Sequence, residues 1–371
     1  VARIPFELTN NLALLQVRVN GSKSLPFILD TGASATVVNQ RLTEELGLKL
    51  EGEGAATTGG GAVEMSFVKG ATLCMPGVEL SGLTLAAIPL SSFEAGLGRP
   101  VGGILGFDIF QRYVVEIDYV TRTVRLHAPA GYQYSGKGQT LPIVVEEQTP
   151  FITAAILEPG GGFVEGKFEL DTGQVGALTL TDSFASRNNL LEPSQKTLEI
   201  TTGAILAGRV NARVSRVKGV QLGRFLLEEP VTNITQSAQD AGVGSDTAGL
   251  IGGEILRRFK VIVDYQRARV ILEPNKQLDS PFIFDMSGMS LSAQGTDFRE
   301  YRVRTLIEGS PAAEAGVKVG DIITDADGKP LARMSLSQIR EMLRKENKAY
   351  VFNIKRGDEV IRIKLKTRKL I

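Results

Sequence analysis

The chain has 371 residues, of which 43% are hydrophobic and 22% charged, so it is long enough for two or three globular domains. Its 42 basic and 41 acidic residues leave a formal net charge of +1, which offers no electrostatic footprint for nucleic acid. No apolar run approaches the length of a membrane span. We therefore expect neither a nucleic-acid partner nor a transmembrane segment.

Residues 1 to about 132 have the pattern of short strands separated by turns. Residues 15–19 alternate as a half-buried strand does, and Asn20-Gly21 predicts a tight hairpin turn into the next strand. Residues 37–46 are expected to form a short helix. A stretch of small side chains that includes Thr58, Gly59, Gly60 and Gly61 then predicts a flexible hairpin tip before an alternating strand over residues 63–68.

One strand of this region ends in a carboxylate. Phe27-Ile28-Leu29 leads directly into Asp30-Thr31-Gly32, followed by Ala33-Ser34. A carboxylate at the end of a buried strand is costly unless it has partners, and glycine lets the backbone turn sharply and approach closely. The arrangement returns 141 positions later as Phe168-Glu169-Leu170-Asp171-Thr172-Gly173. Two such copies are much harder to explain by chance than one.

The repeat extends beyond this motif. Residues 104–119 align without a gap with residues 250–265 at a constant offset of 146, so that Gly106 matches Gly252 and Arg112 matches Arg258. Asp118-Tyr119 matches Asp264-Tyr265 in the same way. A whole structural unit is therefore duplicated, with residues 158–162 as the expected insertion in the second copy.

The doubled pattern of apolar strand, Asp-Thr-Gly and a later apolar-apolar-Gly step resembles the pepsin/retropepsin group of aspartic proteases over roughly residues 1 to 276. The resemblance implies two lobes, residues 1–132 (lobe one) and 133–276 (lobe two), each giving one catalytic carboxylate, Asp30 and Asp171. It also implies orienting roles for Thr31, Gly32, Ser34, Thr172 and Gly173. Thr58 and Gly59 to Gly61 would belong to a flap that closes over substrate. Residues 201–203 would be its counterpart in lobe two.

Two carboxylates within hydrogen-bond reach share one proton over a broad pH range, which supplies an acid and a base at one place. The ionised member would take a proton from a water, while the protonated member donates to the scissile carbonyl, and no cofactor is needed. The pair should titrate as a coupled unit. Gln174-Val175 replaces the usual small residues in lobe two, so we expect unequal surroundings for the two carboxylates, with Gln174 narrowing the approach on one side.

Other chemistries lack their residues. His127, the only histidine, matches Glu273 in the repeat, which indicates an exposed strand end and removes any Ser-His-Asp or Cys-His mechanism. Cys74 is the only cysteine, so no internal disulfide is expected, and a small core residue is favoured. No cluster has the spacing of metal ligands.

A polar linker is expected over residues 275–280. Beyond it, three segments resemble the signature of bacterial PDZ domains, namely Gly309-Ser310-Pro311-Ala312, Ala315-Gly316 and Gly320-Asp321-Ile322-Ile323. Ser335 should cap a helix over residues 336–345. The resemblance implies a peptide groove beside that helix, where N–H groups of Met286, Ser287, Gly288 and Met289 hold a terminal carboxylate. A packing domain without a free ligand is the alternative.

The combined expectation is a mainly β chain, a two-lobed aspartic protease fold with a small α+β PDZ domain over residues 277–371. It would be an aspartic endopeptidase acting on peptides or proteins, with the PDZ domain recruiting substrate, regulating cleavage or taking a C-terminal peptide. A catalytically impaired peptide-binding protein and a paired-chain retropepsin arrangement are the alternatives. PDZ-bearing bacterial proteases favour an exported location, and a chain that begins at Val1 agrees with processing.

Overall fold

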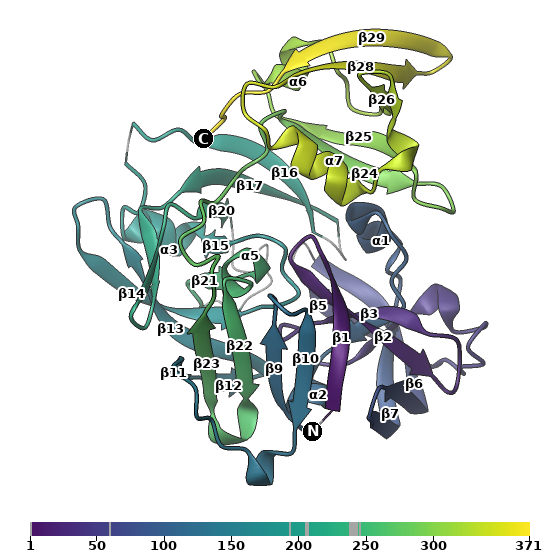
Figure 1. Ribbon diagram of the computed structural model, residues 1–371, viewed down its shortest axis with the longest axis vertical. Coiled ribbons are helices and arrows are strands. Elements are labelled where there is room, and N and C mark those ends of the chain that lie inside the picture. The colour runs from purple at the N-terminus through teal and green to yellow at the C-terminus, as the bar shows by residue number, and fades with distance from the viewer. Residues whose placement is uncertain (1, 59–60, 193, 205–207, 237–243, 245) are drawn as a thin grey trace.

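The described part of the chain folds mainly into β-strands, which form three sheets of 13, 10 and six strands. The computed structural model describes residues 2–58, 61–192, 194–204, 208–236, 244 and 246–371. In Figure 1 the six-stranded sheet, formed by the C-terminal residues, lies over the other two. The predicted fold class, mainly β with a smaller α+β unit at the C-terminus, is confirmed. None of the helices among the described residues is long and apolar enough to cross a membrane.

Lobe one supplies the strands β1 (Ala2–Thr9), β2 (Leu12–Val19), β3 (Leu25–Leu29), β4 (Val37–Asn39), β5 (Glu51–Thr58), β6 (Gly61–Met75), β7 (Val78–Ile88), β8 (Gly103–Leu105), β9 (Val114–Asp118) and β10 (Thr123–His127). Its helices are α1 (Ser91–Leu97) and α2 (Phe107–Phe110), with 3-10 turns η1 (Gln40–Leu42) and η2 (Pro129–Gly131). The predicted turn at Asn20-Gly21 is confirmed, because both residues have the positive φ that such a turn requires.

The helix predicted over residues 37–46 is wrong. Val37 and Val38 instead belong to β4, which pairs with β7 on one side and β8 on the other, and only the single turn η1 follows. The β-branched side chains of these two valines favour a strand, and the paired neighbours outweigh the helix formers that come after them.

Lobe two supplies the strands β11 (Gln139–Pro142), β12 (Val144–Glu146), β13 (Thr149–Leu157), β14 (Phe163–Leu170), β15 (Leu178–Thr181), β16 (Leu198–Ala204), β17 (Gly208–Arg216), β18 (Gly219–Leu222), β19 (Phe225–Glu228), β20 (Val231–Thr235), β21 (Gly249–Ile251), β22 (Phe259–Asp264) and β23 (Arg269–Pro274). Its helices are α3 (Asp182–Arg187) and α5 (Gly253–Leu256), followed by the 3-10 turn η3 (Tyr265–Arg267).

The two lobes share a sheet where β9 pairs with β22. This antiparallel pairing sets Ile117 opposite Val261 and Val115 opposite Val263. At the repeat offset, Val115 corresponds to Val261 and Ile117 to Val263, so the duplicated strand pairs with its own copy about a local two-fold axis. Buried apolar side chains from both lobes form one continuous cluster.

The C-terminal unit contains β24 (Met289–Gln294), β25 (Glu300–Leu306), β26 (Ile322–Ala326), β27 (Lys329–Pro330), β28 (Ala349–Arg356) and β29 (Glu359–Lys366), with α6 (Pro311–Glu314), η4 (Leu331–Arg333) and α7 (Leu336–Leu343). It has a buried core of its own. Ser335 caps α7 as predicted, in a reciprocal capping box with Gln338. The exact division at residues 132 and 276 stays a prediction.

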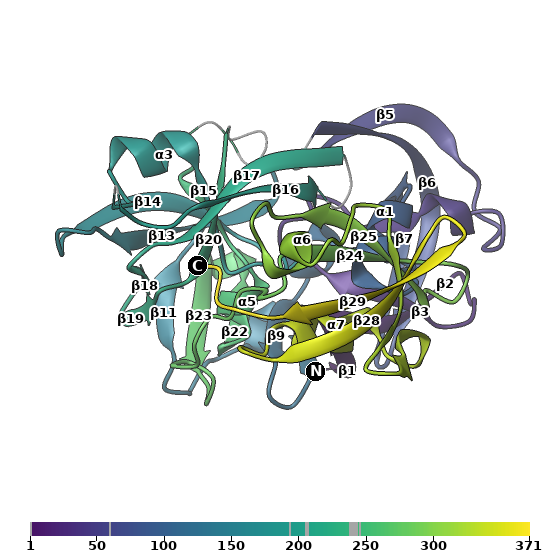
Figure 2. The same cartoon turned by 90° about the horizontal axis from the view of Figure 1, so that it is seen from above.

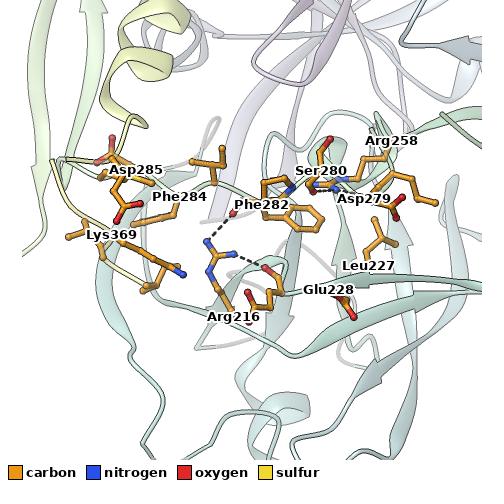
Figure 3. Close-up of a pocket in the computed structure, with 18 of the residues that line it drawn as sticks. Arg216, Leu227, Glu228, Arg258, Asp279, Ser280, Phe282, Phe284, Asp285 and Lys369 are labelled. Atoms are coloured by element: carbon orange, nitrogen blue, oxygen red, sulfur yellow. Dashed lines mark hydrogen bonds between the residues drawn. The ribbon is translucent and has the colours of Figure 1, made fainter. Parts of the chain in front are cut away.

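The segment that joins lobe two to the C-terminal unit is held by two arginines. Arg258, which is 2% exposed, donates from Nη1 to the carbonyl of Leu278 at 2.8 Å, and its guanidinium lies 3.5 Å from the centre of the Phe282 ring. Arg216 Nη2 donates to the Phe282 carbonyl at 3.0 Å. Arg216, Arg258 and Phe282, which Figure 3 labels, line a pocket of about 670 Å³. The linker is therefore anchored to lobe two along its length.

Candidate active site

The two Asp-Thr-Gly loops follow strands in equivalent settings. β3 runs parallel to β8 in lobe one, and β14 runs parallel to β21 in lobe two. The backbone N–H of Asp30 donates to the carbonyl of Leu105 and that of Asp171 to the carbonyl of Ile251, both at 3.0 Å. The same main-chain bond therefore fixes each aspartate as its strand ends.

The loops are bound to each other through their threonines. Thr31 N–H donates to Thr172 Oγ1, and Thr172 N–H donates to Thr31 Oγ1, both at 3.0 Å. Each hydroxyl in turn donates across the lobes, Thr172 to the carbonyl of Leu29 and Thr31 to the carbonyl of Leu170. Both threonines are 1% exposed, so this reciprocal set is buried and fully satisfied. It brings the two predicted catalytic loops face to face.

The glycines allow the carboxylates to approach. Gly32 N–H donates to Asp30 Oδ1 at 2.8 Å, and Gly173 N–H donates to Asp171 Oδ1 at 2.7 Å. A Cβ placed on Gly32 would lie 2.9 Å from Asp171 Cγ, and one placed on Gly173 would overlap the Asp30 carboxyl. Each carboxylate thus packs over the glycine of the opposite loop, and a side-chain hydrogen bond joins Asp30 to Asp171.

The electrostatics favour retention of a proton. Burial raises the pKa of Asp30, although hydrogen bonds from Asp171 and from the amides of Gly32 and Gly173 oppose that shift. The pKa of Asp171 is raised well above its usual range, first by burial and then by the negative charges of Asp30 and Glu169. Two carboxyls that cannot both ionise readily will share one proton.

A third carboxyl, Glu169, lies beside the pair and was not identified from the sequence as a site residue. It is 6% exposed, and its Oε1 atom lies 2.9 Å from where a Cβ on Gly32 would be. Burial, followed by the charge of Asp30, raises the pKa of Glu169 to about 8. The signal was present in the repeat, because the corresponding residue of lobe one is the apolar Ile28.

Two buried tyrosine hydroxyls complete the surroundings. Tyr119 and Tyr265 occupy corresponding places in the repeat, and neither hydroxyl has a hydrogen-bond partner in the described part of the structure. The pKa of Tyr119 is raised by burial and then by the charge of Asp171. The pKa of Tyr265 is raised by burial and then by Asp30 and Glu169. Both hydroxyls therefore stay protonated near the carboxylates.

The remaining predicted loop residues lie less centrally. Ser34 is exposed, and among the described residues it has no hydrogen-bond partner. The backbone of Ala33 instead hydrogen-bonds to Asp30. Gln174 Oε1 accepts from Gly176 N–H at 3.4 Å, so its amide lies against its own loop. The orienting role of Ser34 and the narrowing role of Gln174 stay predictions.

The predicted flap falls on the hairpin of β5 and β6, where Thr58 Oγ1 donates to the carbonyl of Gly61 at 3.1 Å. Gly59 and Gly60 lie outside the described residues. The hairpin of β16 and β17 is its counterpart in lobe two. Figure 2 shows the two hairpins extending toward each other from opposite lobes. The flap function stays a prediction.

The predicted peptide-carboxylate loop of the C-terminal unit is already filled by a side chain of this protein. Asp285 Oδ1 accepts from the N–H of Ser287 at 2.9 Å and from the N–H of Gly288 at 2.6 Å. Met289 N–H donates to Ser287 Oγ, and Met286 N–H donates to the carbonyl of Leu343. An incoming carboxylate would have to displace Asp285, so peptide binding at Met286 to Met289 stays a prediction.

His127 and Cys74 lie apart from these loops. His127 Nε2 is 3.3 Å from Glu116 Oε2, and its ring packs on Tyr132 with a centroid distance of 4.8 Å. Cys74 is a free, partly exposed cysteine on β6 rather than the small core residue that was favoured. Among the described residues, no group of three or more His, Cys, Asp or Glu could hold a metal ion.

Family models match two parts of the chain. One described as an aspartyl protease matches residues 15–109, and one described as a PDZ domain matches residues 302–356. The first contains Asp30 and the lobe-one loop. The second covers most of the six-stranded sheet and α7.

The curated relatives carry a different catalytic type in their names. The periplasmic serine endoprotease DegP of Salmonella typhimurium is 26% identical over 228 residues, which cover 57% of this chain and 46% of that protein. DegP of Escherichia coli K12 is 24% identical over 234 residues, with the same coverage. A probable CtpA-like serine protease of Staphylococcus haemolyticus is 28% identical over 133 residues, covering 36% of this chain and 25% of that protein.

The chain thus spans about half the length of the DegP proteins that it matches. The comparisons agree on peptidase-type sequence together with a PDZ domain, and they differ on whether the peptidase is aspartic or serine in type.

Proposed function

We propose that this protein is an aspartic endopeptidase in which Asp30 and Asp171 form the catalytic dyad and a PDZ domain covers one end of the substrate cleft. The observation that carries the proposal is the reciprocal Thr31 and Thr172 hydrogen bonding, which sets the two carboxyls in contact. Because one chain supplies both loops, the dyad is complete without pairing of two chains. The two lobes, residues 1–132 and 133–276, are part of the same proposal.

The chemistry follows from one shared proton. The ionised carboxylate takes a proton from a water molecule bound between the pair, and the protonated partner donates to the carbonyl oxygen of the scissile peptide. A tetrahedral intermediate forms and collapses without a covalent bond to the enzyme. The amides of Gly32 and Gly173 orient the carboxylates throughout. Burial raises the pKa of Glu169 to about 8, and once Glu169 ionises, its charge raises the pKa of Asp171, so the last proton of the dyad is held to higher pH than in a pair alone.

A serine-type mechanism has weaker support in this chain. A Ser-His-Asp triad needs a histidine within hydrogen-bond reach of a serine. The single histidine, His127, contacts Glu116 and Tyr132, and none of its hydrogen bonds in the described structure goes to a serine. The names of the relatives therefore support a peptidase more than they support their own catalytic type.

The PDZ domain and the names of the relatives bear on the substrate and the location of the protein. A PDZ domain binds peptide or protein, and we propose that here it acts on the same substrates as the lobes. The DegP relatives are named as periplasmic, which supports an exported protein.

The catalytic type is tested by inhibitor profiling of the intact chain. A statine-containing peptide, which mimics the tetrahedral intermediate, should abolish cleavage of a casein substrate. A serine-reactive fluorophosphonate should leave the activity unchanged and label no residue. Labelling of a serine with loss of activity would overturn the aspartic assignment. Binding of the statine peptide without any cleavage would favour the peptide-binding alternative.

A further inference from the structure

A second pocket lies where both lobes meet the PDZ domain. It has a volume of about 370 Å³ and is lined by residues of all three parts. α1 of lobe one packs against β24, the outer strand of the PDZ sheet, and β16 of lobe two contacts β25. Figure 1 shows the PDZ sheet above α1 and the β16–β17 hairpin. The PDZ domain thus forms the roof of this pocket.

The pocket adjoins the catalytic loop of lobe two. Val175 and Gly176, which follow Asp171 in the same loop, line its floor. Asn11 of lobe one holds this part of the loop in place, because its Nδ2 donates to the carbonyl of Val175 at 2.8 Å. The pocket therefore begins four residues beyond Asp171 along this loop.

The lining combines apolar walls with cations of the PDZ domain. The apolar side chains come from all three parts and include Leu12, Phe93, Leu97, Val175, Met289 and Leu291. The cations Arg304, Arg340 and Arg344 come from the PDZ domain alone. The two acidic residues of the lining are Glu254, whose pKa burial raises, and Asp285, whose carboxylate is held by the loop amides.

Two of these arginines have unused donors. Arg340 Nη2 donates to the carbonyl of Gly96 at 2.8 Å and to that of Leu291 at 3.2 Å, but its Nη1 is buried without a partner. Among the described residues, Arg304 has neither a hydrogen-bond nor an ion-pair partner. A buried guanidinium nitrogen without an acceptor is costly, and a carboxylate satisfies such donors best.

We propose that this pocket is a substrate subsite, built jointly by the lobes and the PDZ domain, for an apolar side chain that is followed or preceded by an acidic side chain. Arg304 contacts the acidic side chain and is a specificity-determining residue, and Arg340 lines the same pocket. We assign an internal acidic side chain rather than a terminal carboxylate, because the Ser287 and Gly288 amides that would receive a terminal carboxylate bind Asp285 in this structure. This subsite rests on the proposed endopeptidase function.

The test uses acetylated and amidated decapeptides with a central Leu-Phe pair, in which Glu or Gln is placed in turn at every flanking position. The full-length wild type should cleave the Glu peptide about tenfold faster in kcat/KM at one of those positions. Arg304→Gln should remove the preference, and Arg304→Glu should reverse it in favour of Lys. Arg362→Gln on β29, at the far edge of the PDZ sheet, is the matched control and should behave as wild type.

Binding to the Asp30→Asn variant, measured by fluorescence anisotropy with the same peptides, separates this subsite from the catalytic proposal. If the variant binds the Glu peptide more tightly only when Arg304 is present, and the wild type cleaves no peptide, the endopeptidase proposal is wrong and the subsite proposal stands. If wild type and Arg304→Gln cleave with the same preference for Glu, the subsite proposal is wrong and the endopeptidase proposal stands. A preference that appears only with a free terminal carboxyl would also contradict it.

Discussion

The two halves of the repeat hold their aspartates with the same hydrogen bonds but in different surroundings. Asp30 and Asp171 have equivalent main-chain bonds, threonine partners and glycine amides. Behind them the halves diverge, because lobe one has Ile28 where lobe two has the buried Glu169. Groups that fix the position of the carboxyls have stayed alike, whereas the groups that set their proton affinity have not.

The same divergence appears at the paired arginines. Arg112 and Arg258 each donate to the carbonyl four residues earlier, Asp108 and Glu254. Arg112 stays partly exposed, whereas Arg258 is buried and also binds the linker. Lobe two has thus taken on two tasks, a third carboxyl at the dyad and the attachment of the PDZ domain.

The largest effect should come from the glycines. Gly173→Ala places a methyl group inside the Asp30 carboxyl, so we expect kcat/KM to fall by about 100-fold or more. Gly32→Ala, with its Cβ 2.9 Å from Asp171 Cγ, should cost less. Gly160→Ala meets no atom within 4 Å and serves as the control. Equal activity in all three variants would contradict the close approach.

The second-largest effect should be on the free energy of unfolding, and it should differ between the paired arginines Arg112 and Arg258. Arg258→Met leaves the linker carbonyls without their donor, so the free energy of unfolding should fall by about 2 kcal/mol. Arg112→Met, at a partly exposed site, should change it by less than about 1 kcal/mol. Denaturant titration of both variants measures this difference, and similar losses would mean that the linker is not anchored as described.

Glu169→Gln should change the pH dependence. Without the carboxylate, the pKa of Asp171 falls, so the alkaline limb of the kcat/KM profile should move to lower pH. The folded-state pKa of Glu169 is raised from 4.5 to about 8, so ionisation of Glu169 lowers the free energy of unfolding of the wild type as pH rises through that window. The free energy of unfolding of the variant should fall less over the same range.

The control for this titration is Glu165→Gln, an exposed carboxyl on the same strand β14. It should leave both the activity profile and the pH dependence of unfolding as in wild type. If the alkaline limb of the kcat/KM profile is unchanged in Glu169→Gln, Glu169 does not affect the pKa of the dyad.

The smallest effect is expected at Gln174. Its amide lies against its own loop, so Gln174→Ala should alter the relative cleavage rates of a peptide library by only a few-fold, about 1 kcal/mol or less. Mass spectrometry of the library digests measures these rates. Identical cut sites and an identical pH profile would refute the predicted narrowing of the approach.

Local patterns predicted much of this molecule. The duplicated Asp-Thr-Gly loops, the Asn20-Gly21 turn and the Ser335 cap depend on neighbours in sequence, and all three are found in the structure. Residues 37–46 were misjudged because pairing with β7 and β8 decides their conformation. That pairing joins segments distant in the chain, so no local window contains it.

The features that the sequence did not reveal are contacts across the fold. Asp285 in the amide loop, α1 against β24 and Arg258 under the linker each depend on where separate elements meet. Glu169 was visible as a charged residue opposite Ile28 in the repeat. Its proximity to both aspartates required the packed loops.

The most direct test of the dyad compares three variants, Asp30→Asn, Asp171→Asn and His127→Gln, in kcat/KM for one cleaved peptide at neutral pH. Each aspartate variant should lose more than about a thousandfold, since a shared proton needs both carboxyls, while His127→Gln keeps wild-type activity. If Asp30→Asn keeps its activity and His127→Gln loses it, the aspartic mechanism is contradicted. That result would favour the serine-type mechanism that the names of the relatives indicate.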